Sequence, residues 1–367
     1  MSEHDSSDRT ITSLPISAER EVEWTHVLVV AEGDRAGERF VLERELSIGR
    51  DPTCDVRLVD RSVSRLHCRV ILAEQRALVT DNGSTNGTFV DGARVQGSAA
   101  LKPGALLRIG DHLLRHEVRT ATEAAREAEL AQDLRKAREY VAALIPAPLA
   151  RADVRIEWAF QPCAALGGDL LGYHWIDDAR LAVYVLDVCG HGVGPAMHSA
   201  SVFNALRGQT LPHTDFASPA QVLAALNQHF EMERHGGMYL TAWYGVLELR
   251  ARRLSFASAG HPPALLLEGA RSTRLATKSP PIGVSEGRRF TQSQVELGAR
   301  SRLWVLSDGV FEFTSSDERV FSLDEFEREL LAAPHSSPSD VQRALQGRAK
   351  RGVFEDDFSM LTVSLEP

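Results

Sequence analysis

Short apolar runs separated by turn residues fill the first third of the chain. From about Val22, segments such as THVLVV, LSIGR, HCRVILAE and HLLRHEV are rich in Val, Leu and Ile, and Gly, Pro, Asn or Asp stands between them. Short strands at this spacing are typical of an all-β sandwich. We therefore expect a β-sandwich over residues 22–118, preceded by a polar, Ser- and Asp-rich tail over residues 1–21 that is predicted to be disordered.

The pattern becomes helical after the predicted sandwich. Residues 119–145 lack Gly and Pro, and two prolines, Pro146 and Pro148, follow them. Apolar residues alternate four and three positions apart along a short heptad seam. Two heptads fit either a helix packed on one neighbouring domain or a dimerising coiled coil, and the sequence leaves both open. The seam consists of Leu130, Leu134, Ala137, Val141 and Leu144.

Strands and helices are mixed in the remainder, residues 149–367. Strand-like runs 239–249 and 253–259 are joined by a turn too short for a helical crossover, so they are expected to pair antiparallel. This pattern predicts an α+β domain in which antiparallel sheets are layered with helices. The other strand-like runs are LAVYVLDV, ALLLEG, RLWVLSDG and FSMLTVSLE, and helices are expected at 195–209, 219–234, 323–333 and 338–350.

The charge, the cysteines and the lack of long apolar stretches exclude several classes of function. The chain has 367 residues, and its 50 acidic against 41 basic residues give a formal charge of -9, so no broad basic field exists to hold a nucleic acid. Four cysteines without a CxxC pair indicate neither a disulfide framework nor a zinc site, which favours a reducing compartment. No stretch approaches the ~20 apolar residues of a membrane span, and no signal peptide is evident. We expect a cytoplasmic protein with neither nucleic-acid nor membrane partners.

Three motifs in predicted loops of the sandwich carry phosphate-binding chemistry. They are Gly49-Arg50, Ser64-Arg65-Leu66-His67 and the run 81–88, DNGSTNGT. Together they supply a guanidinium, hydroxyls and amides, which are the donors that a phosphate dianion needs. Any one of them alone is equally well explained as a turn.

In this order the three motifs resemble the forkhead-associated (FHA) domain, over about residues 24–117. The resemblance implies that Arg50 and Ser64 hold the phosphate of a phosphothreonine, that Thr85 and Asn86 complete the peptide contact and that Arg65 assists. Gly49 and His67 are expected to act as scaffold. The implied partner is a phosphothreonine protein or a serine/threonine kinase.

Four aspartates in the α+β region follow apolar runs or glycines. Carboxylates delivered to one rim would repel each other unless a hard cation lay between them, and oxygen ligands favour Mg²⁺ or Mn²⁺. Two such ions can activate a water for attack on phosphorus. Each aspartate alone is equally a turn residue. They are Asp169 in GGD, Asp187 in LDVCGHG, Asp308 in LSDGV and Asp356 in EDDFS.

The order GGD, DVxGHG, TAWYGVLE, SAGHPP, SDG and DDFS resembles the PPM-type protein phosphatases, in their bacterial stage II sporulation E-like branch, over about residues 146–366. The resemblance implies two ions, Mn²⁺ or Mg²⁺, with Asp187 bridging both beside the Val188 carbonyl. Asp169 would complete one metal, and Asp308 and Asp356 the other. It also implies that an activated water attacks the phosphate, so no side chain serves as nucleophile.

Three positions depart from the family pattern. Gly172 stands where a second aspartate usually follows GGD, Cys189 replaces serine and Ser307 replaces threonine. An aspartate restored at Gly172 is expected to leave activity unchanged or to raise it. His191 and His261 lie beside glycines and are interpreted as shaping loops, although acid catalysis is an alternative.

The leading hypothesis is a multidomain bacterial signalling protein: a tail (1–21), an FHA sandwich (22–118), a helical linker (119–148) and a phosphatase domain (149–367). The expected activity is metal-dependent hydrolysis of phosphoserine or phosphothreonine on a regulatory protein, with an anti-sigma-factor antagonist as first candidate. The alternative is a phosphopeptide-binding scaffold with a degenerate phosphatase fold. A third hypothesis is that the FHA domain binds the chain's own tail when Thr10 or Thr12 is phosphorylated. Whether the chain forms a homodimer through residues 119–145 stays open.

Overall fold

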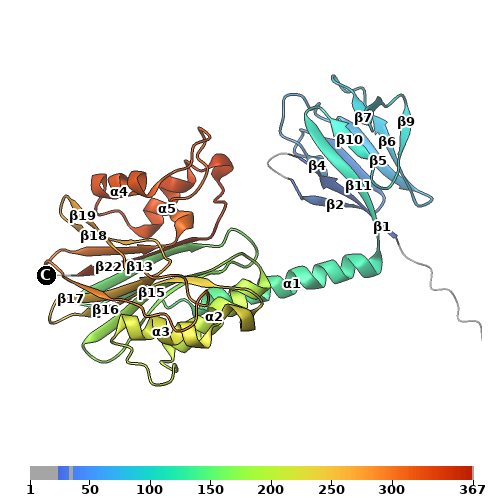
Figure 1. Ribbon diagram of the computed structural model, residues 1–367. Coiled ribbons are helices and arrows are strands. Elements are labelled where there is room, and N and C mark those ends of the chain that lie inside the picture. The colour runs from blue at the N-terminus through green and yellow to red at the C-terminus, as the bar shows by residue number, and fades with distance from the viewer. Residues whose placement is uncertain (1–23, 33–35, 366–367) are drawn as a thin grey trace, which may run out of the picture. The chain divides into compact units, whose positions relative to one another are not determined.

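The computed structural model describes residues 24–32 and 36–365, which divide into two compact units, residues 1–130 and 131–367. Figure 1 shows the strands of the first unit, helix α1 and the larger second unit. The predicted multidomain architecture, a β-sandwich followed by an α+β domain of antiparallel sheets, is confirmed. The predicted tail, with Thr10 and Thr12, lies outside the described residues. None of the described helices is both long and apolar enough to cross a membrane.

Two sheets make up the first unit. One has the strand order β2-β1-β11-β10-β7-β8 and the other the order β4-β3-β5-β6-β9. All pairs are antiparallel except β3 with β4, which are parallel. The strands are β1 (Trp24–Val30), β2 (Arg39–Leu42), β3 (Glu45–Gly49), β4 (Val56–Arg57), β5 (Cys68–Ala73), β6 (Arg76–Asp81), β7 (Thr88–Val90), β8 (Ala93–Arg94), β9 (Ser98–Leu101), β10 (Leu106–Ile109) and β11 (His112–Thr120).

The core of this unit follows from alternation along its strands. In β5 and β6, inward residues such as Val70 and Val79 are fully buried while their neighbours face outward, as a half-buried strand requires. Strands β8 and β9 were not expected, because ARVQGSAAL has too few β-branched residues to stand out. Pairing with β7 and β6 defines them instead.

The predicted linker helix is α1, Ala121–Leu144. Thr120 and Glu123 exchange side-chain and backbone hydrogen bonds of 2.9 and 3.1 Å at its start, which satisfies free N–H groups of the first turn. At its other end Leu144 and Ile145 are buried in the core of the second unit. The last turn therefore packs on that unit, as one of the two open alternatives expects.

The second unit consists of a six-stranded and a five-stranded antiparallel sheet, which lie between two pairs of helices (Figure 1). The orders are β12-β13-β22-β21-β18-β19 and β14-β15-β16-β17-β20. Helices α2 and α3 cover the second sheet, and α4 and α5 cover the first. The first sheet comprises β12 (Leu149–Ala150), β13 (Val154–Gln161), β18 (Ala264–Glu268), β19 (Arg271–Leu275), β21 (Arg302–Leu306) and β22 (Phe358–Leu365). The second comprises β14 (Asp169–Trp175), β15 (Arg180–Val188), β16 (Leu240–Glu248), β17 (Arg253–Ala259) and β20 (Ser293–Glu296).

Four α-helices lie close to the predicted positions, but two are shorter. The predicted helix 219–234 is α3, Pro219–His229, followed by a separate 3-10 turn, Met232–His235. The predicted helix 338–350 is α5, Pro338–Gln346, with Gly347 at its C-terminal cap. The others are α2 (Val193–Arg207) and α4 (Leu323–Ala332), whose capping box at Ser322 was expected from the sequence.

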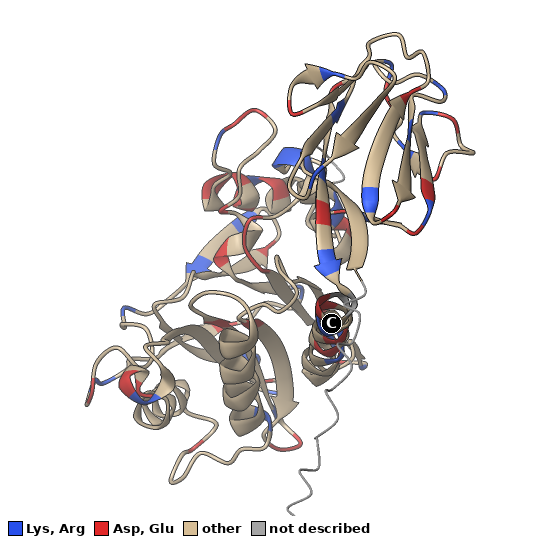
Figure 2. Cartoon of the chain, turned by 90° about the vertical axis from the view of Figure 1, so that its right-hand side faces the viewer, with Lys and Arg blue, Asp and Glu red and all other residues tan. Residues whose placement is uncertain are grey.

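Apolar side chains fill the space between the two sheets, where Trp243 donates to the Leu275 carbonyl of the facing sheet, and Tyr184 and Tyr244 pack on the opposite face, toward Phe203 and Phe216. A second cluster, which includes Trp304, Phe313 and Phe326, lies between the first sheet and helices α4 and α5. Figure 2 shows acidic and basic residues interspersed along the strands and loops of each unit, in line with the mixed charge of the sequence. This rigid frame fixes the strand ends that carry the candidate site residues.

Candidate functional sites

The loops at one end of the β-sandwich bring the predicted phosphate-binding residues together. The backbone N–H of Arg50 donates to the Ser64 carbonyl at 3.0 Å, which ties the turn after β3 to the loop before β5. Arg50, Ser64, Arg65 and Thr85 line one surface cavity of about 290 Å³. The arginine side chains are exposed, so their guanidinium groups are available to an anionic ligand.

Two further contacts join the third loop to this cavity. The Thr85 N–H donates to Ser64 Oγ at 3.1 Å, and their hydroxyl oxygens lie 3.4 Å apart. Asn86 Nδ2 donates to the Ser62 carbonyl at 2.8 Å. The five residues predicted from the sequence therefore belong to one network of loops.

Two neighbouring residues support the loops rather than line the cavity. His67 is fully buried, and its ring contacts the Ser64 N–H at 3.1 Å and the Gly87 carbonyl at 3.3 Å. A Cβ at Gly49 would lie 2.0 Å from the Arg65 carbonyl oxygen, so a side chain there would force the loops apart. Sequence reasoning missed Arg61, which lines the same cavity; its only signal was a basic residue three positions before Ser64.

In the second unit, Asp169 and Asp187 occupy directly opposed positions of β14 and β15. Asp169 is 3% exposed, and burial together with the charges of Asp187 and Asp357 raises the pKa of its carboxyl well above the usual range. Burial, followed by the charges of Asp308 and Asp356, raises the pKa of Asp187 to about 7. The strongest charges that act on Asp187 are thus negative, as expected of a site built for a cation.

The other two predicted aspartates lie at the ends of the neighbouring sheet. Asp308 begins a 3-10 turn directly after β21, and Asp356 lies two residues before β22. Burial, and next the charge of Asp356, raises the pKa of Asp308. Asp187 is thus within electrostatic reach of the other three predicted aspartates, which lie at strand ends of the two sheets.

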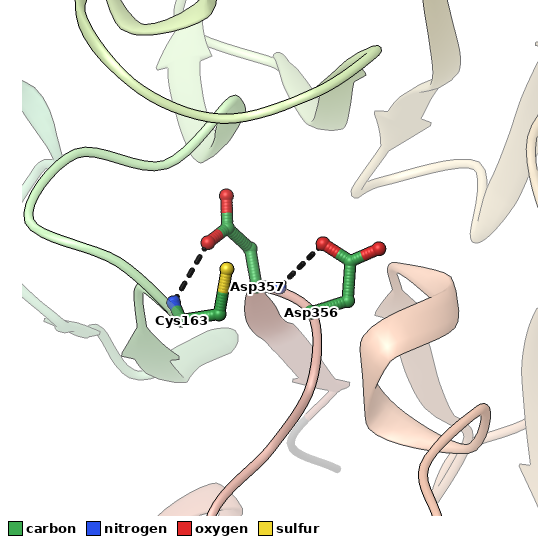
Figure 3. Close-up of side chains that lie close together, drawn as sticks. All are labelled: Cys163, Asp356 and Asp357. Atoms are coloured by element: carbon green, nitrogen blue, oxygen red, sulfur yellow. Dashed lines mark hydrogen bonds between the residues drawn. The ribbon is translucent and has the colours of Figure 1, made fainter. Parts of the chain in front are cut away.

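Sequence reasoning did not assign Asp357, which holds these strand ends together. Its carboxylate accepts hydrogen bonds from the backbone N–H of Cys163 at 2.8 Å (Figure 3) and of Asp169 at 3.2 Å. A Cβ at Gly167 would lie 2.1 Å from the same carboxylate, and one at Gly309 would lie 2.2 Å from the Asp357 carbonyl. The first glycine of GGD, Gly167, and the glycine of SDG, Gly309, are therefore explained by the close approach of Asp357.

Two observations test whether this rim fits a cation. Asp169 Oδ2 is buried and has no hydrogen-bond partner among the described residues, and the Ser359 and Ser307 hydroxyls that favour the charged form of this carboxyl do not outweigh its burial and the neighbouring negative charges. A Cβ at Gly168 would lie 2.2 Å from the Val188 carbonyl oxygen, so only glycine leaves that oxygen uncovered. Carboxylate and carbonyl oxygens are suitable donors for Mg²⁺ or Mn²⁺, so the residues present fit such ions.

Residues that the sequence left without a catalytic role have structural contacts. Ser307 is fully buried, and its hydroxyl donates to the Asp357 carbonyl at 3.2 Å. Cys189 Sγ accepts the Tyr239 N–H at 3.3 Å. His261 is buried beside the Thr241 hydroxyl at 2.6 Å, and burial lowers the pKa of its ring to about 3, whereas His191 is exposed.

The expectation for Gly172 needs correction. This residue is buried within β14 instead of lying at the rim that carries the aspartates. A Cβ there would lie 2.6 Å from the Phe203 ring and 3.2 Å from the Tyr184 ring. An aspartate restored at this position would therefore enter an aromatic core and could not reach the rim.

Comparison with known proteins finds similarities in both units. Residues 177–366 match the stage II sporulation protein E (SpoIIE) family, a metal-dependent family, and residues 46–110 match the FHA domain. Phosphoserine phosphatase RsbP of Bacillus subtilis is 32% identical over 196 residues, which are 52% of this chain and 46% of RsbP. The chain thus spans less than half the length of that relative.

Two further similarities cover the separate units. The glycogen accumulation regulator GarA of Mycobacterium tuberculosis is 42% identical over 85 residues, 23% of this chain and 52% of GarA. The SiaA-PP2C domain of Pseudomonas aeruginosa is 19% identical with a TM-score of 0.56, covering 65% of this chain and 97% of that domain, which establishes the shared fold. With the match over more than half of its length, the chain belongs to the stage II sporulation protein E family and carries an FHA domain ahead of the phosphatase fold.

Proposed function

We propose that this protein is a metal-dependent protein serine/threonine phosphatase whose FHA domain docks on phosphothreonine partners. The observation that carries the proposal is the meeting of Asp169, Asp187, Asp308 and Asp356 at one rim, where negative charges act on one another and a buried carboxylate oxygen lacks a partner. The resemblance to RsbP, a phosphoserine phosphatase, supports the same chemistry.

In this proposal Asp187 would hold both of two Mn²⁺ or Mg²⁺ ions, with the Val188 carbonyl beside it. Asp169 would serve one ion, and Asp308 and Asp356 would serve the other. The chemistry that such ions supply when bound is charge neutralisation at the phosphoryl group and activation of water. No side chain of the rim need act as nucleophile.

The chain's own residues would position the reaction. Asp357 fixes the loop 162–168 through the Cys163 and Asp169 N–H groups, so that the Asp169 carboxylate stays at the rim. The Thr241 hydroxyl donates to Asp187 Oδ2 at 3.3 Å and orients it. The proposed substrate is phosphoserine or phosphothreonine on a regulatory protein, with an anti-sigma-factor antagonist as first candidate.

The FHA domain is proposed to select where the phosphatase acts. Arg50 and Ser64 would bind the phosphate of a phosphothreonine protein or kinase, with Arg65, Thr85 and Asn86 contacting the peptide. The domain boundaries 22–118, 119–148 and 149–367, a cytoplasmic location and dimerisation through α1 belong to the same proposal.

The test is phosphate release from an aryl phosphate and from a phosphoserine peptide across Mn²⁺ and Mg²⁺ concentrations. Asp187→Asn and Asp308→Asn are expected to lose at least a hundredfold in rate, since each removes a ligand charge. Asp178→Asn is the matched control, because Asp178 is exposed in the β14–β15 turn. A wild-type protein that binds phosphopeptide but releases no phosphate with either ion would favour the scaffold alternative.

A further inference from the structure

A second cavity of the α+β unit, of about 610 Å³, lies at one end of the sheet that helices α4 and α5 cover. One row of paired residues lines it: Ser364 of β22 pairs with Arg155 of β13 on one side and with Arg302 of β21 on the other. Directly paired residues point to the same face of a sheet, so three strands contribute to one surface. Pro334 and His335, in the loop between α4 and α5, line the cavity from another side. Its volume is typical of small-molecule sites.

This cavity is separate from both sites described above. Arg302 begins β21, and Asp308 of the rim follows the other end of the same strand. Ser364 lies near the end of β22, whereas Asp356 lies before its start. A strand rises about 3.3 Å per residue, which sets Arg302 and Asp308 roughly 20 Å apart. The Arg50 cavity belongs to the other unit.

Positive charge prevails around the cavity, although the whole chain carries a formal charge of -9. Among the described residues that line it, Glu157 is the one acidic side chain. The neighbouring Glu268 carboxylate does not line the cavity, and it accepts a hydrogen bond from the Ser301 hydroxyl at 2.7 Å. The cationic lining residues are Arg155, Arg300 and Arg302.

The guanidinium of Arg302 is buried with little compensation of its charge. Its side chain is 13% exposed, and its Cζ lies 4.5 Å from the centre of the Trp304 ring. Nη1 donates to the Pro334 carbonyl at 2.9 Å, whereas Nη2 lies 3.9 Å from Glu157 Oε2, beyond hydrogen-bond distance. Nε is buried and has no hydrogen-bond partner among the described residues. Burial lowers the pKa of this guanidinium, and the Glu157 charge opposes the shift only in part. A cation in this setting is costly to bury unless an anion compensates it.

We propose that this cavity binds a small organic phosphate, with the phosphate group on Arg155 and Arg302 and the organic group against the apolar part of the lining. The planar guanidinium fork matches the oxygens of a phosphate in bidentate geometry. A free phosphate ion would leave the apolar surface unused, which favours a phosphate ester. That surface comes from Leu267, Pro334 and Leu365. The inference does not rest on the proposed function, because neither the rim nor the Arg50 cavity takes part.

The experiment is calorimetry on the full chain that carries Arg50→Ala, with chelator present throughout. Under these conditions neither the FHA site nor metal ions at the rim compete for phosphate. ADP offers phosphate with an organic group, pyrophosphate offers phosphate alone, and citrate offers carboxylates alone. ADP is expected to bind saturably at one site per chain, more tightly than pyrophosphate and at least tenfold more tightly than citrate.

Three substitutions test the place of binding. Arg155→Gln and Arg302→Lys should each weaken ADP binding at least tenfold, because each removes a forked, charge-assisted contact. Arg155 is exposed, so its variant keeps the test valid if Arg302→Lys fails to fold. Glu157→Gln should strengthen binding about threefold, since it removes the negative charge that faces the ligand. A folding defect cannot produce such a gain.

Arg343→Gln is the matched control, because the Arg343 side chain is 76% exposed on α5 and does not line the cavity. It should bind ADP as the parent chain does, and circular dichroism verifies the fold of every variant. The proposal is overturned if neither ADP nor pyrophosphate binds saturably at millimolar concentrations, if citrate binds as tightly as ADP, or if Arg155→Gln behaves like the control.

One competitor for the cavity belongs to the chain itself. The sequence continues after Leu365 with Glu366, an acidic residue outside the described part of the chain. Glu366→Gln should leave the ADP affinity unchanged if an external phosphate is the ligand. A tenfold gain in affinity would show that the chain's own segment occupies the cavity, and it would overturn the proposal.

Discussion

Asp169 and Asp187 face each other as paired residues of the β14–β15 ladder. Like charges directly opposite in a sheet are destabilising, and here both carboxylates are largely desolvated, since burial is the main cause of both raised pKa values. The pair is a local source of instability in the metal-free protein. A cation between the carboxylates would turn it into a source of stability.

The contribution of Asp187 to the stability of the metal-free protein is expected to fall as pH rises. The pKa of Asp187 is about 7 in the folded protein against an ordinary value of 3.8, so this carboxyl binds more protons in the folded state between these pH values. Buried His174 and His198, whose pKa values burial lowers to about 4, act in the opposite direction, so the informative quantity is the difference between the wild type and Asp187→Asn. Unfolding scans in chelator from pH 4 to 8 should show the wild-type midpoint falling relative to that of Asp187→Asn, which should lie roughly 2–6 °C higher at pH 8.

The control for this scan is Asp178→Asn, which removes a carboxylate from an exposed turn and should follow the wild type. Adding Mn²⁺ should stabilise the wild type more than Asp187→Asn, because the ion binds the folded state preferentially. A wild-type midpoint that does not fall with pH relative to that of Asp187→Asn in chelator would contradict the proposed repulsion.

The sequence indicated four candidate aspartates but could not predict how they are arranged in space. Asp187, Asp308 and Asp356 each follow or precede an apolar run, and such a run places a carboxylate at a strand end. The role of Asp357 can be recognised only in the folded structure, because its partners Cys163 and Asp169 are 194 and 188 residues away along the chain. No local pattern distinguishes it from its exposed neighbour.

Gly172→Asp is expected to unfold or strongly destabilise the second unit. The new side chain would overlap Phe203 and bury a carboxylate without a partner, which together should cost more than about 3 kcal/mol. Chemical denaturation of the metal-free variant measures this loss. Gly172→Ala should show a smaller loss of stability, because its methyl group overlaps the Phe203 ring but buries no carboxylate.

Gly194→Ala is the matched control for that overlap. Its Cβ would lie 3.7 Å from Met238 Sδ, an ordinary contact, and alanine is favoured over glycine within a helix such as α2. It should therefore leave stability unchanged or raise it by up to about 1 kcal/mol. Wild-type stability in Gly172→Asp would show that β14 can move away from Phe203.

Strands β13 and β14 illustrate a second limit of the sequence pattern. VRIEWAFQ alternates only in part, and DLLGYHW carries an aspartate, a glycine and a histidine within a strand. The neighbours β22 and β15 define them by continuous pairing over Val154–Gln161 and Asp169–Trp175. Tertiary pairing overrides weak local preference in both cases.

A phosphothreonine peptide is expected to bind the FHA domain, and its unphosphorylated form is not. Arg50→Ala should weaken binding roughly ten- to a hundredfold, because a charge-assisted contact to the phosphate is lost. Arg115→Ala is the control, since Arg115 is an exposed residue of β11 paired with Glu117 and does not line the Arg50 cavity. Calorimetry with both peptides gives the affinities, and equal binding of the two would reduce the domain to a structural module.

Thr241 is expected to act as a positioning residue for Asp187. Its hydroxyl donates to Asp187 Oδ2 at 3.3 Å, and this bond opposes the burial that raises the pKa of that carboxyl. Thr241→Val keeps the shape but removes the donor, so the Asp187 pKa should rise further. Because protons and Mn²⁺ compete for the carboxylate, Mn²⁺ binding should then require a pH higher by about 0.5 to 1 unit, the equivalent of one hydrogen bond.

Calorimetric Mn²⁺ affinities between pH 6 and 8 measure this shift directly. Thr241→Ser restores the hydroxyl and should restore the wild-type profile, which separates the hydrogen bond from the packing of the threonine methyl group. If Thr241→Val weakened Mn²⁺ binding equally at every pH, the residue would act on the shape of the site, through its contact with His261, and not on the charge of Asp187.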